Sequence, residues 1–175
     1  MRLLTKPSVW KVLVILMASG TLLTACEKFN WFEHDKKGHD KCPETTPFDL
    51  NVNLRGEAKK SGHIKFRQDP DAEKIITLDV SVQNLKPTHE YLLQRAVDAL
   101  NELDCNCTST TWLTLGKGLV PQSIWTDKHG DGSEALWRDI TTAASGSKFD
   151  IHFQVIDAVS SAVVLTSDCY QYQVR

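Results

Sequence analysis

The sequence predicts an all-β domain over residues 48–175, folded as one antiparallel β-sandwich of about seven to nine strands. Two observations predict this fold. Apolar and polar residues alternate with a period of two in several segments, which is the pattern of strands that bury one face. Turn-forming residues separate these segments, so that strands recur every eight to twelve residues or so.

The clearest predicted strand is residues 76–83, where every second residue is isoleucine, leucine or valine and the intervening residues are polar. The same alternation runs through residues 50–55 and 149–155. Less regular apolar segments predict further strands at 111–115, 123–126, 135–140 and 163–174.

Turn signals lie between the predicted strands. They are rich in glycine, proline, aspartate and serine and occur at 61–62, 69–71, 86–88, 116–118, 129–132 and 145–147. Short strands with this punctuation are typical of an immunoglobulin-like sandwich.

Residues 90–103 carry two patterns. Leucine, alanine and valine recur there at helical spacing, but the first half also suits a strand that is buried on both faces. We expect a strand at 90–97, followed by a short helical or irregular excursion at 98–106.

Residues 1–25 are expected to form the helix of a lipoprotein signal peptide. Three basic residues precede an apolar segment at 12–23. The segment ends in Leu23-Thr24-Ala25-Cys26, which resembles a bacterial lipobox. A plain secretory signal or an uncleaved membrane helix is the alternative, but a spanning helix needs about 20 apolar residues and this segment is shorter.

The lipobox resemblance implies cleavage before Cys26 and acylation of its thiol. The protein would then be anchored in the bacterial cell envelope, outside the cytoplasm, through a membrane-inserted lipid. Each buried methylene of an acyl chain contributes about 0.8 kcal/mol, so two or three chains make a durable anchor. Glu27 is not the aspartate of inner-membrane retention, which favours the outer membrane where the host has two membranes.

Residues 26–47 are expected to form a flexible tether, because their mixed charges and prolines leave little apolar surface to bury. After removal of residues 1–25, the chain carries 17 basic and 22 acidic residues, a net charge of −5. The basic residues are scattered, which excludes the electrostatic footprint of a nucleic-acid-binding protein.

Four cysteines remain after Cys26 is assigned to the lipid, and an even number in an exported chain predicts disulfides. Cys105 and Cys107 are too close in sequence to bond without strain. The open pairings are Cys107–Cys169 with Cys42–Cys105, or Cys105–Cys169 with Cys42–Cys107. The first is favoured, because Cys107 precedes a predicted strand whereas Cys105 lies in a loop.

A series of short motifs spans residues 48–174. A strand is followed by Asn84-Leu85-Lys86-Pro87 and a second strand, and then by Gly130-x-Gly132 and Gly146-x-x-Phe149-Asp150. This order resembles the β-sandwich domains of the chordin-type and copper/zinc superoxide dismutase-like superfamily. The dismutases carry a His-x-His metal pair on the second strand, which here reads Tyr91-Leu92-Leu93-Gln94-Arg95. The resemblance therefore implies the fold without the metal site.

No cofactor, bound metal or catalytic residue is expected. Two tether histidines and Cys42 offer transition-metal ligands, but a flexible peptide would have to be ordered around the metal. The Cys-x-Cys pair is spaced more closely than is usual for zinc. A calcium loop starting at Asp127 fails where His129 and Arg138 replace oxygen ligands, so a hairpin connection is expected there. His152 alternates outward and is expected to be a surface residue.

Trp112, Trp125 and Trp137 are the candidate ligand contacts, because exposed indole rings suit sugars and protein partners. Trp137 alternates with Leu136 and Ile140, which predicts that it faces outward. The expected function is non-catalytic binding or a structural role towards an envelope protein or glycan. A metal-binding or degenerate dismutase-like enzyme domain is the alternative.

Overall fold

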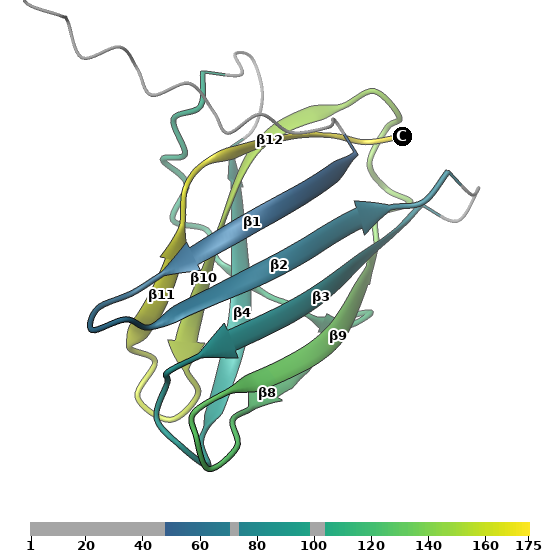
Figure 1. Ribbon diagram of the computed structural model, residues 1–175. Coiled ribbons are helices and arrows are strands. Elements are labelled where there is room, and N and C mark those ends of the chain that lie inside the picture. Colours follow the sequence, from purple (N-terminus) through teal and green to yellow (C-terminus); the bar gives the residue numbers. More distant parts are fainter. Residues whose placement is uncertain (1–47, 71–73, 99–103) are drawn as a thin grey trace, which may run out of the picture. The chain divides into compact units, whose positions relative to one another are not determined.

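The described part of the chain consists of strands, turns and irregular segments. The computed structural model describes residues 48–70, 74–98 and 104–175, all within the second of two compact units, Lys37–Arg175. These residues contain no helix, and twelve strands form one hydrogen-bonded sheet (Figure 1). The all-β prediction is confirmed. The predicted signal peptide, Cys26 and the tether lie outside the described residues.

The strands have the following bounds in chain order: β1 Asp49–Arg55, β2 Ser61–Gln68, β3 Ile75–Gln83, β4 Glu90–Asp98, β5 Leu113–Thr114, β6 Gly116–Lys117, β7 Val120–Pro121, β8 Ser123–Trp125, β9 Gly132–Asp139, β10 Lys148–Asp157, β11 Val163–Ser167 and β12 Tyr170–Gln173. In the described ranges, no helix is long and apolar enough to cross a membrane.

The sheet nearly closes on itself around one core. Its order runs β4–β10–β11–β1–β2–β3–β9, and β8 pairs with β4 at Tyr91 and Ile124. A bridge between Thr126 and Gly132 links the end of β8 to the start of β9. Strand β8 therefore connects the two ends of this order, and the sheet is barrel-like.

The predicted immunoglobulin-like sandwich of two stacked sheets is not confirmed. The described residues form twelve strands rather than the expected seven to nine, because four short strands of two or three residues join eight longer ones. All of them join one sheet, because β10 pairs with β4 along one edge and with both β11 and β12 along the other. Its register shifts between Val155 and Ile156, and such a bulge bends a strand.

The predicted alternation places apolar side chains inside the sheet. The inward apolar residues of β1 and β3 are buried, and the Phe66 ring of β2 contacts the rings of Phe153 and Tyr172. The strands expected at 50–55, 76–83, 123–126, 135–140 and 149–155 are confirmed within a few residues at their ends. The strand expected at 90–97 is β4, and residues 104–106 form no helix.

The strand expected at 163–174 is interrupted and forms β11 and β12. The hydroxyl of Ser167 explains the interruption, because it accepts a hydrogen bond from the backbone N–H of Phe153 at 2.9 Å and donates one to the carbonyl of Asp168 at 2.7 Å. The side chain thus replaces backbone pairing at the point where the strand bends.

Two further predictions give the wrong residue bounds for a turn and for a strand. The turn expected at 61–62 lies within β2, and the chain turns instead at Gly56–Lys60, where Ala58 and Lys59 adopt φ of 51° and 68°. Of the strand expected at 111–115, Leu113–Thr114 pairs with β4, and the backbone N–H of Leu115 donates a hydrogen bond of 2.8 Å to the carbonyl of Leu93. The preceding residues lie across the outside of the sheet, where a disulfide holds them.

Candidate functional site

The three candidate tryptophans lie in different surroundings. Trp125 on β8 is 59% exposed and Trp137 on β9 is 41% exposed, whereas Leu136 beside it is buried. The prediction that Trp137 faces outward is confirmed. Trp112 is half-buried and its ring lies 4.7 Å from that of His152, centroid to centroid. Trp125 and Trp137 therefore offer the more accessible rings.

His152 is not a plain surface residue, which corrects the expectation. It does alternate outward from β10, but its Nε2 lies 3.0 Å from the carbonyl oxygen of Ser109 and its ring contacts Trp112. The segment at 104–112 therefore covers the outer face of β10, and this cover buries Asp150 and Gln154 on that face.

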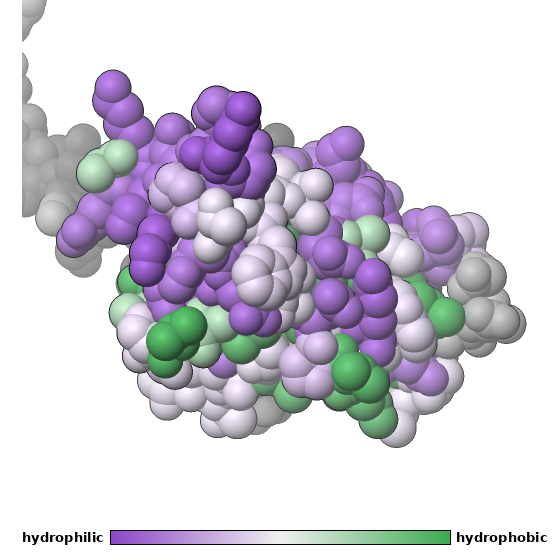
Figure 2. Space-filling model, turned by 90° about the horizontal axis from the view of Figure 1, so that it is seen from below, coloured by the Kyte–Doolittle hydropathy of each residue, from purple (hydrophilic) through white to green (hydrophobic). Residues whose placement is uncertain are grey.

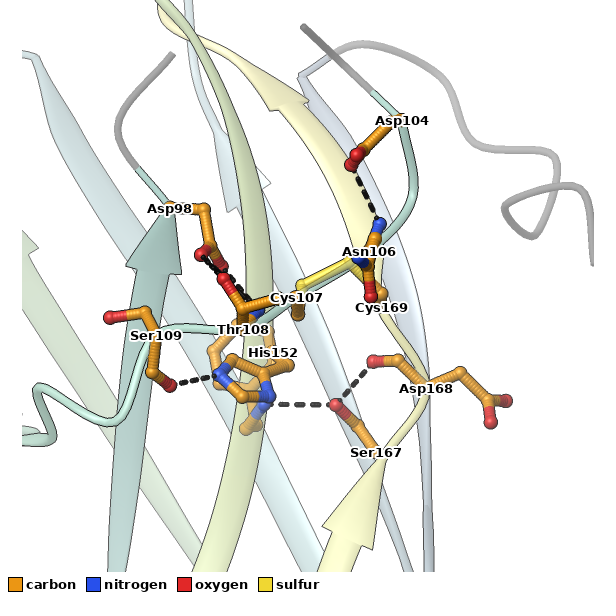
Figure 3. The surroundings of a disulfide bond; sticks show 11 residues. Asp98, Asp104, Asn106, Cys107, Thr108, Ser109, His152, Ser167, Asp168 and Cys169 are labelled. Carbon is orange, nitrogen blue, oxygen red and sulfur yellow. Dashed lines mark hydrogen bonds between the residues drawn. A yellow bond between two sulfur atoms is a disulfide. The ribbon is translucent and has the colours of Figure 1, made fainter. Parts of the chain in front are cut away.

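The covering segment is held by the disulfide Cys107–Cys169, as favoured from the sequence (Figure 3). Beside it, the hydroxyl and the backbone N–H of Thr108 donate hydrogen bonds to the Asp98 carboxylate at the end of β4. Cys105 is also disulfide-bonded. Cys42, its expected partner, lies outside the described residues, so that pairing stays a prediction.

A polar hollow of about 530 Å³ lies beside Trp125. It is bordered by the ends of β3 and β8, the start of β9 and the loop between β8 and β9. The side chains of Ser81, Gln83 and Ser133 line it and make no hydrogen bond to another described residue. Their hydroxyl and amide groups are therefore available to a ligand.

The loop at 127–131 forms an ordered rim of this hollow. The Asp127 carboxylate accepts hydrogen bonds from the backbone N–H groups of Asp131 and His129, which lower the pKa of Asp127. Gly130 has a φ of 86°, and a Cβ there would collide with the carbonyl oxygen of Leu85. These contacts are those of a tight hairpin connection, as expected from the sequence, with the carboxylate of Asp127 occupied by backbone donors.

The outer face of β9 runs from the hollow to Trp137. Ser133, Ala135 and Trp137 share this face, and they pair with Ser81, Asp79 and Thr77 of β3. Ser133 and Trp137 are four positions apart on β9, a distance of roughly 13 Å. A strip of small and polar side chains thus connects the hollow beside Trp125 with the second exposed ring.

Trp137 packs against the hairpin of β6 and β7. The N–H of Gly118 donates to the Trp137 carbonyl at 2.9 Å, and a Cβ on Gly118 would come within 2.8 Å of the indole. Leu119 and Val120 follow in this hairpin and are 79% and 69% exposed. One end of the strip therefore contains the indole ring of Trp137, the backbone of Gly118 packed against it, and the side chains of Leu119 and Val120.

The face of the molecule seen from below is not a continuous apolar patch (Figure 2). Figure 2, which views the molecule from below the orientation of Figure 1, shows mainly hydrophilic and neutral residues with separate hydrophobic spots. Large contiguous apolar patches are the usual mark of protein interfaces.

Sequence reasoning missed one feature of the interior. Arg95 of β4 and Arg138 of β9 both line an apolar cavity inside the sheet. The signal was present, because each arginine occupies an inward position of an alternating strand, between Leu93 and Val97 in β4 and between Leu136 and Ile140 along β9.

Within the described ranges, no three histidine, cysteine, aspartate or glutamate side chains come together as a metal site. The tether histidines and Cys42 lie outside those ranges. The chain matches no protein-family model, no curated protein and no solved structure.

Proposed function

We propose that this protein is a non-catalytic binding domain of the bacterial cell envelope that holds a glycan against the outer face of β3, β8 and β9. The observation that carries the proposal is the exposed Trp125 ring at the border of a polar hollow of about 530 Å³. The hollow is open to solvent, as a site for an extended surface ligand would be.

The chemistry of the hollow suits a sugar. The C–H face of a pyranose packs on an indole ring, while its hydroxyls need donors and acceptors around the ring. Ser81, Gln83 and Ser133 supply those groups. An extended glycan continuing along β9 from Ser133 reaches Trp137, about 13 Å further along the strand, which provides a second ring.

The anchor complements this binding role. The basic leader, the apolar segment and Leu23-Thr24-Ala25-Cys26 support acylation of Cys26 and retention in the outer membrane. A domain attached by lipid on one side and by glycan on the other would connect the membrane to envelope polysaccharide.

A protein partner is the second candidate. Leu119 and Val120 are strongly exposed beside Trp137, and aliphatic side chains around an aromatic ring suit a protein surface better than a sugar. This candidate uses the hairpin of β6 and β7 rather than the hollow beside Trp125, so variants distinguish the two.

The test is cosedimentation of the mature acylated protein, reconstituted in phosphatidylcholine vesicles, with glycan strands released from bacterial cell walls. Trp125→Ala should lower the affinity about tenfold or more, which corresponds to 1.4 kcal/mol. Trp137→Ala should lower the affinity as well, and Val163→Ala, at an exposed position on β11, should leave it unchanged.

Two results would contradict the glycan proposal. One is equal glycan binding by the wild type and by the double Trp125→Ala, Trp137→Ala variant. The other is a wild type that binds no glycan but crosslinks to an envelope protein, with the crosslink lost in the Leu119→Asp variant. This result would favour the protein partner.

A further inference from the structure

The interior of the sheet contains a cavity of about 170 Å³ that the outer-face site does not use. Aromatic and aliphatic side chains form most of its wall, among them Phe66, Leu78, Phe149 and Phe153. A cavity of about 150 Å³ is large enough to hold benzene, so this one accepts a compact apolar group.

Arg95 enters this cavity from β4. The inward residues of that strand are Tyr91, Leu93, Arg95 and Val97, and the first two are at most 2% exposed. Arg95 pairs across the backbone with Phe153 of β10, and its guanidinium donates no hydrogen bond to another described residue. Burial, and then the charge of Arg138, lower the pKa of Arg95, but a guanidinium stays protonated in proteins.

Arg138 enters the same cavity from β9, which lies far from β4 in the order of strands along the sheet. It donates a long hydrogen bond of 3.4 Å to the carbonyl of Gly118. Among the described residues, no carboxylate lies within 4 Å of either guanidinium, the distance that defines an ion pair.

The two acidic residues nearest in sequence to Arg138 also interact with other groups. Asp139 also lines the cavity; its carboxylate accepts a hydrogen bond of 2.7 Å from the backbone N–H of Thr141, and this bond and then the charge of Arg138 lower the pKa of Asp139. Glu134 forms an ion pair of 2.8 Å with Lys117. Among the described residues that line the cavity, the two guanidinium groups thus face a single carboxylate, that of Asp139.

Two guanidinium groups in one cavity favour the binding of an anion there over the binding of water. Both arginines are partly buried, and like charges repel each other more strongly where water is scarce. A carboxylate matches the forked geometry of a guanidinium and forms two parallel hydrogen bonds with it. Inorganic anions would satisfy the charge but would leave the aromatic wall without a partner.

We propose that this cavity is a binding site for a small carboxylate with a compact apolar body, held by Arg95 and Arg138 at its charged end and by the aromatic wall at the other. This ligand is distinct from the glycan of the outer face, because the inward and outward faces of β9 belong to different sites. The volume suits an aryl carboxylate such as benzoate.

Equilibrium dialysis of labelled benzoate against the mature acylated protein in a polyoxyethylene detergent tests the proposal. The wild type should bind benzoate at least tenfold more tightly than benzamide, its neutral analogue, and more tightly than inorganic phosphate. Arg95→Met and Arg138→Met should each lower the benzoate affinity about tenfold or more while leaving benzamide binding little changed. Arg55→Met is the control, because Arg55 is exposed and pairs with Asp168 at 2.7 Å.

The comparison of benzoate with benzamide needs only the wild type, so it decides the matter even where a variant fails to fold. Equal affinity for the two compounds would overturn the proposal, and so would phosphate binding as tight as that of benzoate. Unchanged benzoate affinity in a folded Arg95→Met, Arg138→Met double variant would also overturn it. None of these outcomes affects the glycan proposal, whose variants lie on the outer face.

Discussion

Cys107 and Cys169 are bonded to each other, with their Cα atoms 5.5 Å apart, although 62 residues separate them in the chain. Cys107 belongs to the segment that covers the outer face of β10, and Cys169 lies between β11 and β12 (Figure 3). The bond therefore fastens this cover to the edge of the sheet where β10 changes its partner from β11 to β12.

Replacing Cys169 by serine should destabilise the domain. Closing a loop of 62 residues contributes about 4 kcal/mol in the chain-entropy estimate, through the unfolded state. We expect the melting temperature to fall by about 10 °C in calorimetry. Cys42→Ser, which acts at the end of the tether, should cost much less. Peptide mapping without reductant that finds Cys107 and Cys169 as free thiols would show that the bond does not form.

Asp150 should make the stability of the domain depend on pH. It is 3% exposed, and its Oδ1 accepts no hydrogen bond from a described residue. Burial, followed by the neighbouring Asp104, raises the pKa of Asp150. The folded state therefore holds the proton more tightly than the unfolded state, and stability declines as the pH rises above about 3.8, the ordinary value.

Asp150→Asn removes this ionisable group. The variant should be more stable than the wild type at pH 7, and the difference should vanish below about pH 3.8. Urea unfolding across this pH range measures the effect. A variant that is less stable than the wild type at pH 7 would show that the carboxylate is needed in its charged form.

Asp157 should have the opposite pH dependence. Its carboxylate accepts hydrogen bonds of 2.9 Å from the backbone N–H groups of Ser160 and Val159, and His89 Nε2 lies 2.7 Å from it. The Ser160 bond, then the contact with His89, lowers the pKa of Asp157 to about 2. Its stabilising contribution is complete above about pH 3.8 and is lost as the pH falls through about 2.

Asp157→Ala should therefore lower the melting temperature at pH 7, and wild type and variant should converge towards pH 2. Asp168→Ala is the matched control, because Asp168 forms an exposed ion pair with Arg55, and such pairs contribute little. A variant with the same melting temperature as the wild type at pH 7 would mean that the 157–161 turn does not depend on this carboxylate.

Cys26→Ser tests the predicted anchor. Without the thiol, acylation is impossible, so the protein should leave the membrane fraction or accumulate as the uncleaved precursor. Fractionation and mass spectrometry of the N-terminal peptide distinguish these forms. A Cys26→Ser protein that is cleaved and stays on the membrane would contradict the lipobox interpretation.

The sequence was a sufficient guide to the strands that bury one face. Leu50, Val52 and Leu54 alternate with polar residues, and the structure buries all three. The same rule predicted the outward direction of Trp137. It was misleading where a side chain takes over backbone pairing, as at Ser167, because such local substitutions leave no periodic trace.

What the sequence determined by itself is therefore mainly local: the all-β class, most strand positions and the exposed Trp137. The favoured pairing of Cys107 with Cys169 is the exception, because it joins residues far apart in the chain. The tertiary structure decided which strands are neighbours. Strand order depends on contacts between residues far apart in the chain, and period-two alternation is the same in a sandwich and in a nearly closed sheet. Only closure by β8, with β4 and β9 at either end of the order, brings Arg95 and Arg138 into one cavity and places Trp125 beside a polar hollow.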